Sequence, residues 1–141
     1  MDELLTKDLD YCIILYEDRP DRSHWTALSR YNGIYEHFDS DGNKPDKSLK
    51  WVNLNMRRRL NEATPDLTNI LQKNQYIYNN VKNQDRDGYV NMCGSHAVHR
   101  LYRLKNDGMD LHTYYNYMKH IKDEFGINYD IIVAEFVNKC F

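Results

Sequence analysis

The sequence lacks the features that would place a protein in a membrane, secreted or nucleic-acid-binding class. No apolar run approaches the roughly 18 residues of a membrane helix. Neither charge dominates, because 19 Lys and Arg stand against 21 Asp and Glu for a net charge of -2, so duplex nucleic acid is not expected as the main ligand. Acidic residues stand near Met1, where a signal peptide would carry basic ones. We therefore expect an intracellular protein that does not bind membranes.

Cysteine is also scarce. The three cysteines, Cys12, Cys93 and Cys140, are an odd number at wide spacing, and no Cys-x-x-Cys pair exists. This pattern is not a disulfide framework and is typical of a reducing compartment. Cys12 falls in an apolar run and Cys140 at the end of the chain, so we expect both to be structural.

Repeats, low-complexity stretches and linkers are absent, which predicts a single domain over residues 1–141. β-branched and aromatic residues predict strands, and apolar residues at helical spacing predict helices. Strands come first and helices last, which indicates an α+β fold with a small mixed sheet flanked by helices. The expected strands are 9–16, 24–29, 34–40 and 76–78, and the expected helices are 48–61, 65–72, 94–105, 110–123 and 129–139.

Asn32-Gly33 between two strand-like runs predicts a tight hairpin, because both residues tolerate positive φ. With these two at the centre of the turn, paired residue numbers sum to 65. His24 and Asp39 then become diagonal neighbours on one face, where the carboxylate can accept the imidazole N–H and fix its tautomer. We expect the other face to bury Trp25, Ala27, Ile34 and Phe38. His37 shares the predicted face of His24 and is a weaker alternative base.

Cys93 follows a polar loop and precedes a predicted helix. A thiol at a helix N-terminus near a protonated histidine has a lowered pKa, and the thiolate is the reactive form. Gly94 would allow a substrate backbone to approach closely, and the Cys93 N–H is free to donate to an oxyanion. The sequence thus offers a nucleophile, a base and an orienting acid, the set used in acyl transfer.

These residues resemble a known family. His24-Trp25, Phe38-Asp39-Ser40 fifteen residues later, and Cys93-Gly94 follow the order found in the adenain and SUMO-protease superfamily of cysteine proteases. The run from Cys93 to Leu101 is most similar to the viral members, which include the adenovirus protease and relatives in large DNA viruses and virophages. The resemblance covers roughly residues 9–105, and it implies an adenain-like or papain-like cysteine protease core.

The resemblance also implies roles. Cys93 would be the nucleophile, His24 the general base and acid, and Asp39 its orienting partner. Gln84 is the best candidate for the oxyanion-hole amide, although it lies nine positions before Cys93, a longer gap than usual; the more distant alternatives are Gln75 and Gln72. Trp25 and Gly94 would line the substrate cleft, a role that conflicts with placing Trp25 in the core.

Other patterns have plainer interpretations. Cys93, His96 and His99 have helical spacing for a metal site, but no second pair of ligands is evident, so we predict no metal. We expect both histidines on the helix surface or at the cleft rim. Arg57-Arg58-Arg59 is expected to be a solvated helix face rather than a nucleic-acid contact.

The resemblance implies an endopeptidase without a cofactor that cleaves after small residues, at Gly-Gly-X-like sites. Its substrates would be viral capsid or other structural precursors, processed during particle maturation. The enzyme would act in the host cytoplasm or nucleus or be packaged in the virion, and a peptide activator stays open. Two alternatives remain: a deconjugase for ubiquitin or a ubiquitin-like protein such as SUMO, and a catalytically dead structural protein with a protease fold.

Overall fold

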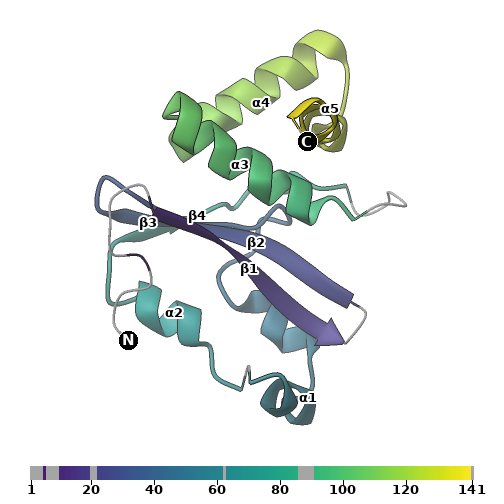
Figure 1. The fold of residues 1–141 in the computed structure, drawn as a ribbon. Coiled ribbons are helices and arrows are strands. Elements are labelled where there is room, and N and C mark those ends of the chain that lie inside the picture. Colours follow the sequence, from purple (N-terminus) through teal and green to yellow (C-terminus); the bar gives the residue numbers. More distant parts are fainter. Residues whose placement is uncertain (1–4, 6–9, 20–21, 62, 86–90, 141) are drawn as a thin grey trace.

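The computed structural model describes residues 5, 10–19, 22–61, 63–85 and 91–140. They form an α+β fold in which a four-stranded sheet lies between two groups of helices (Figure 1). Strand order is β1-β2-β3-β4; the first three strands are antiparallel, and β4 is parallel to β3. The strands are β1 (Asp10–Arg19), β2 (Arg22–Tyr31), β3 (Ile34–Phe38) and β4 (Tyr76–Tyr78). The helices are η1 (Lys47–Trp51), α1 (Leu54–Arg59), α2 (Asp66–Leu71), α3 (Cys93–Asp107), α4 (Leu111–Phe125) and α5 (Tyr129–Cys140).

The predicted hairpin is confirmed. Asn32 and Gly33 have φ of 51° and 75°, as a type I′ turn requires. Tyr31 pairs with Ile34 and Ala27 with Phe38, so every pair sums to 65. This register brings the start of β2 beside the end of β3, where His24 and Asp39 lie. Residue 9, the first of the expected opening strand, is outside the described residues.

The prediction of a single helix over 48–61 is wrong, because the structure has two helices there, η1 and α1. Val52 is extended, with φ of -107° and ψ of 128°, and ends η1. The Asn53 side chain then accepts a hydrogen bond from the Met56 N–H at 2.9 Å and caps α1. An N-cap asparagine begins a new helix and so interrupts the apolar period that suggested one. The other expected helices are confirmed, with ends shifted by at most two residues.

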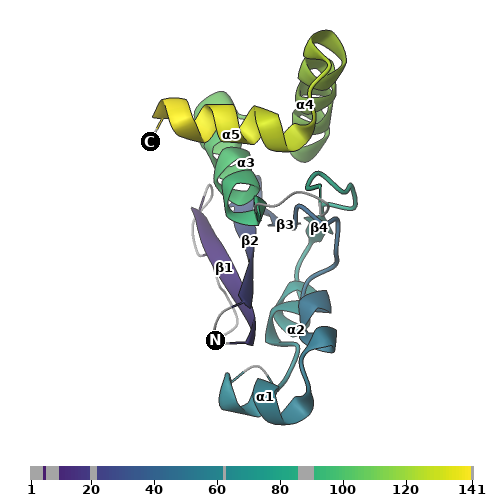
Figure 2. The same cartoon turned by 90° about the vertical axis from the view of Figure 1, so that its right-hand side faces the viewer.

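Each face of the sheet has its own apolar core. Helices α3, α4 and α5 cover one face, and α2 lies against the other (Figure 2). Ala27 and Phe38 are buried under α3, α4 and α5, as expected. Trp25 and Ile34 are not core residues, since they are 38% and 37% exposed. Both lie near a strand end, where the covering helices no longer shield them.

One buried ion pair joins α3 to the sheet. Arg100 donates from Nε and Nη2 to the two carboxylate oxygens of Glu36 at 2.7 and 2.8 Å, and from Nη1 to the Met109 carbonyl at 2.9 Å. The guanidinium also lies over the Tyr114 ring, 5.0 Å from its centroid. A guanidinium whose three nitrogens all donate in this way fixes the position of α3 on the sheet. No helix in the described part of the chain is long and apolar enough to cross a bilayer.

We predict that Glu36→Ala lowers the free energy of unfolding by about 3–5 kcal/mol, because it leaves Arg100 buried without its partner. The double variant Glu36→Met/Arg100→Met should recover much of this loss. Urea denaturation measures both. The exposed pair of Lys119 and Asp123 provides the control, and Asp123→Ala should leave the denaturation midpoint unchanged. A double variant no more stable than Glu36→Ala would contradict the prediction.

Candidate active site

The start of β2 and the end of β3 place a histidine against a carboxylate. His24 Nε2–H donates to Asp39 Oδ1 at 2.8 Å, and Asp39 is only 2% exposed. The Asp41 N–H donates to the same oxygen at 2.8 Å and holds the carboxylate in place. Since Asp39 occupies Nε2, the other ring nitrogen of His24 is left for Cys93, with which the imidazole interacts directly. The structure therefore brings His24 and Asp39 together, as the hairpin register predicts.

Cys93 is the first residue of α3 and is 1% exposed. Because α3 packs across β2, its N-terminus lies at the same end of the sheet as His24. The Trp25 N–H donates to Cys93 Sγ at 3.3 Å. The indole of Trp25 lies beside Gly94, so that a Cβ at position 94 would be 3.6 Å from Trp25 Cδ1. The indole therefore borders Cys93, at the edge of the site rather than in the core.

The electrostatics favour a thiolate–imidazolium pair. Burial lowers the pKa of His24, but its hydrogen bonds and charge interactions with Asp39 and Cys93 outweigh burial and raise this pKa to about 10. Burial raises the pKa of Cys93, but the interaction with His24 and the N–H groups of Trp25 and Gly94 lower it below its usual value. Burial likewise raises the pKa of Asp39, and its hydrogen bond to His24 brings it below the ordinary range. At neutral pH His24 and Asp39 are therefore charged, and the lowered pKa of Cys93 favours its thiolate.

Two hydrogen-bond donors converge next to the sulfur. Gln84 Nε2 and the Cys93 backbone N–H both donate to Asn91 Oδ1, at 2.9 and 3.2 Å. Two N–H groups on one carbonyl oxygen form the arrangement of an oxyanion hole. Gln84, the sequence candidate, thus lies at this point, while Gln72 and Gln75 are exposed residues around the end of α2 and the start of β4.

Several residues that support the site escaped the sequence interpretation. The Ser40 hydroxyl donates to Gln84 Oε1 at 2.9 Å, which turns the Gln84 NH₂ group toward Cys93. Asn79 is buried; its Nδ2 donates to the Asp39 and Val81 carbonyls, and its Oδ1 accepts from the Tyr115 hydroxyl at 2.6 Å. Ser40 follows the predicted acid directly, a signal that could have been used. Nothing in the sequence singles out Asn79.

His96 and His99 are completely buried, so the expectation of surface positions is wrong. His96 Nε2 bonds Asp130 Oδ1 at 2.7 Å, and Asp130 Oδ2 accepts from the Asp85 N–H at 3.0 Å. This chain of bonds ties α3 and α5 to the residue after Gln84. His99 Nδ1 bonds the Tyr114 hydroxyl at 2.8 Å. Apolar neighbours on both sides of α3 explain why these polar residues are internal.

The described residues contain one group with metal-ligand spacing, and it excludes Cys93. Ligand atoms of His24, Asp39 and Asp41 lie within 4.8 Å of one another, with 4.0 Å between His24 Nε2 and Asp41 Oδ2. A cation here would have to displace the proton shared by His24 and Asp39. The suggested set of Cys93, His96 and His99 does not converge, because each histidine is bonded elsewhere.

His37 does not serve as an alternative base. It is fully buried, and burial lowers its pKa to about 4 despite the opposing charge of Asp39. Among the described residues neither ring nitrogen has a hydrogen-bond partner. It therefore lies in the structure as a neutral imidazole.

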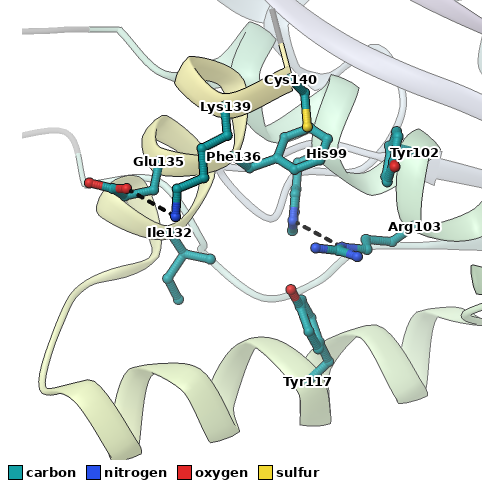
Figure 3. A pocket seen from close by; sticks show the side chains of 9 residues that line it. All are labelled: His99, Tyr102, Arg103, Tyr117, Ile132, Glu135, Phe136, Lys139 and Cys140. Carbon is teal, nitrogen blue, oxygen red and sulfur yellow. Dashed lines mark hydrogen bonds and ion pairs between the residues drawn. The ribbon is translucent and has the colours of Figure 1, made fainter.

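A separate hollow of about 340 Å³ lies among α3, α4 and α5 (Figure 3). Tyr102, Tyr117 and Phe136 supply aromatic walls, and the Arg103 guanidinium lies 4.9 Å from the Tyr117 ring centroid. Cys140 lines it as an exposed thiol, so the expectation of a structural role for Cys140 is wrong. Cys12 is half-buried, and burial raises its pKa. No residue of the Cys93 site lines this hollow.

We predict that iodoacetamide at pH 7 alkylates Cys93 faster than Cys12, because thiolate reacts and only Cys93 combines a lowered pKa with a partner cation. Asp39→Asn should move the pH at which Cys93 becomes reactive upward, since it removes the carboxylate that keeps His24 charged. Peptide mass spectrometry after timed labelling measures both. The exposed Cys140 is the internal reference for accessibility. If the alkylation rate of Cys93 depended on pH in the same way in wild type and Asp39→Asn, this electrostatic description would be contradicted.

Comparison with known proteins gives one named relative. No protein-family model and no solved structure matches the chain. The chain is 31% identical over 126 residues to the uncharacterized protein V9 of Sputnik virophage, which covers 87% of this chain and 70% of the virophage protein. The aligned stretch is long enough that it must include most of the residues of the site. The chain belongs to the same protein family as V9 of Sputnik virophage.

Proposed function

We propose that this protein is a cysteine endopeptidase that cleaves after small residues. The observation that carries the proposal is the bond of 2.8 Å between His24 Nε2 and the Asp39 carboxylate, next to Trp25, whose N–H donates to Cys93 Sγ at 3.3 Å. A buried thiol that only fills space has no reason to be ionised. The order of these groups and the position of Cys93 at the start of a helix packed on the sheet favour an adenain-like or papain-like core.

The proposed mechanism starts from the charged pair. The Cys93 thiolate attacks the scissile carbonyl carbon, and the electron pair of the C=O bond moves to oxygen. Gln84 Nε2 and the Cys93 N–H stabilise this oxyanion, and His24 gives its proton to the departing amine as the C–N bond breaks. His24 then takes a proton from water, which attacks the thioester and releases the acid and the thiolate.

The resemblance to the adenain superfamily suggests the preference for small residues, and the edge of the site is compatible with it. The Trp25 indole lies beside Gly94, and position 94 carries no side chain. The absence of a side chain at position 94 leaves room for a substrate backbone to approach Cys93 closely. Trp25 is partly exposed and can pack flat on such an extended chain.

Kinship with a virophage protein supports a viral setting. We therefore propose viral capsid or other structural precursors as substrates, cleaved during particle maturation in the host cell or in the virion. A peptide activator is compatible with this proposal. Nucleic acid is a weaker candidate partner, because the net charge is -2. The basic run of α1 is largely exposed, as a solvated face would be.

A second candidate is a deconjugase for ubiquitin or a ubiquitin-like protein such as SUMO, favoured by the same narrow approach to Cys93. Such an enzyme must also bind the folded surface of its substrate. Trapping separates the two: a ubiquitin-like protein with a C-terminal electrophile should label Cys93 no faster than a matched Gly-Gly peptide electrophile. Labelling at least tenfold faster by the folded probe would favour the deconjugase.

One comparison distinguishes the thiol protease from two alternatives. These are a metal site at His24, Asp39 and Asp41 and a catalytically dead fold. A thiol protease keeps its activity in EDTA and loses it on alkylation of Cys93. Loss in EDTA with recovery on adding a divalent metal would favour the metal site. An intact fold that neither alkylates at Cys93 nor cleaves any peptide would favour the dead fold.

We predict that Cys93→Ala abolishes cleavage of a peptide containing Gly-Gly-X while the circular dichroism spectrum stays unchanged. The reason is that the variant removes the nucleophile from a site whose backbone is held by α3. Cys12→Ala is the matched control and should cleave at the wild-type rate.

The variant Gln84→Ala tests the proposed oxyanion donor in the same cleavage assay. It should reduce kcat by roughly 10²–10³-fold, as expected for loss of one oxyanion donor, while iodoacetamide still labels Cys93. Continued cleavage by Cys93→Ala would contradict the proposed function. Unaltered kcat in Gln84→Ala would contradict the role of Gln84.

A further inference from the structure

Asn91 occupies the position that the substrate oxygen needs. Its Oδ1 accepts from Gln84 Nε2 at 2.9 Å and from the Cys93 N–H at 3.2 Å. We propose that the Asn91 carboxamide is an internal competitor for the oxyanion hole, which the substrate carbonyl must displace before the thiolate can attack. This inference rests on the proposed function and adds a form of self-inhibition to it.

The chemistry of the occupant supports the proposal. The oxygen in the hole is the carbonyl oxygen of an amide, the same group that a peptide substrate presents. It accepts from two donors that share no other partner among the described residues, one a side chain and the other the backbone at the start of α3. Donor distances near 3 Å are those of an oxyanion hole in use. Asn91 thus imitates the amide carbonyl of the substrate in its ground state.

The two donors are held in place from behind, independently of Asn91. The Ser40 hydroxyl donates to Gln84 Oε1 at 2.9 Å, and the Gln84 N–H donates to the Ser40 carbonyl at 3.0 Å. Cys93 is fixed by α3 and by the Trp25 N–H on its sulfur. The hole should therefore keep its shape when Asn91 leaves.

Asn91 itself can leave at low cost. The residue is exposed and precedes α3. Rotation of an exposed side chain exchanges its two hydrogen bonds for bonds to water, and each such exchange changes little free energy. The Asn91 carboxamide is thus a weak competitor, which delays substrate binding without preventing it.

A helix cap is the plainer role for this residue. Asn91 Oδ1 satisfies the N–H of Cys93, and Met92 supplies no side-chain cap. A cap needs only the bond from the Cys93 N–H, whereas here Gln84 Nε2 also donates to Asn91 Oδ1. The two roles make different predictions: loss of a cap only lowers stability, whereas loss of a competitor also strengthens binding of an acyl mimic.

The test compares two thiol probes on wild type and Asn91→Ala. A peptide aldehyde ending in Gly-glycinal forms a bond from sulfur to the carbonyl carbon, and the carbonyl oxygen enters the hole and takes a proton. Iodoacetamide reacts at carbon with loss of iodide and develops no oxyanion. We expect the aldehyde inhibition constant of Asn91→Ala to fall about 3- to 10-fold, the equivalent of one or two weak hydrogen bonds, with an iodoacetamide rate within twofold of wild type.

Two further variants keep the result interpretable. Asn53→Ala removes a comparable exposed cap from α1 and should leave both probes unchanged. Asn91→Asp retains a capping acceptor. The ratio of its aldehyde affinity to its iodoacetamide rate should be no higher than the same ratio for wild type. Equal or weaker aldehyde binding by Asn91→Ala would overturn the inference. So would failure of the aldehyde to bind both unalkylated proteins, if iodoacetamide shows that their Cys93 is reactive.

Failure of the proposed function gives a different pattern. If Asn91→Ala binds the aldehyde more tightly but neither protein cleaves any Gly-Gly peptide, competition for the hole stands and the endopeptidase assignment fails. If wild type cleaves and Asn91→Ala binds the aldehyde no better, the endopeptidase stands and the competitor fails.

Discussion

The hydrogen bond between His24 and Asp39 is the interaction on which the site depends. The bond lies where β2 extends past its last pair with β3. The Asn32-Gly33 turn sets the register between these two strands. The bond keeps the imidazole protonated against the effect of burial, and the imidazolium in turn stabilises the Cys93 thiolate. Because Asp39 has only this cation as a close charged partner in the described site, loss of either residue leaves a buried group uncompensated.

The same short segment supports both halves of the chemistry. Asp39 orients the proposed base, His24, and Ser40, the next residue, orients Gln84, one of the two proposed oxyanion donors. Asn79, the residue after β4, anchors this segment through the Asp39 carbonyl. The buried pair of Arg100 and Glu36 holds α3 on the sheet, and with it Cys93. The proposed acid, base, nucleophile and oxyanion donors are therefore parts of one packed unit rather than separate loops.

Much of this arrangement follows from local sequence rules. The Asn32-Gly33 turn fixes the register by counting, and the helices α3, α4 and α5 follow from apolar spacing and the glycines that end α3 and α4. Local rules fail where a residue depends on tertiary neighbours. His96 and His99 are polar residues that become internal because α4 and α5 pack over α3. The role of Asn91 could not be foreseen either, because its bond to Gln84 forms only in the folded chain, although Cys93 is close to it in sequence.

The central claim is that His24 stays charged because Asp39 and Cys93 flank it. Nitrogen-15 chemical shifts of the His24 ring, followed by NMR across pH, test this most directly. The account predicts an imidazolium that persists through neutral pH and loses its proton near pH 10, with Nε2 protonated throughout. It also predicts that Cys93→Ser or Asp39→Asn lowers that titration. A wild-type His24 that titrates near 6.5, as a free histidine does, would contradict the account.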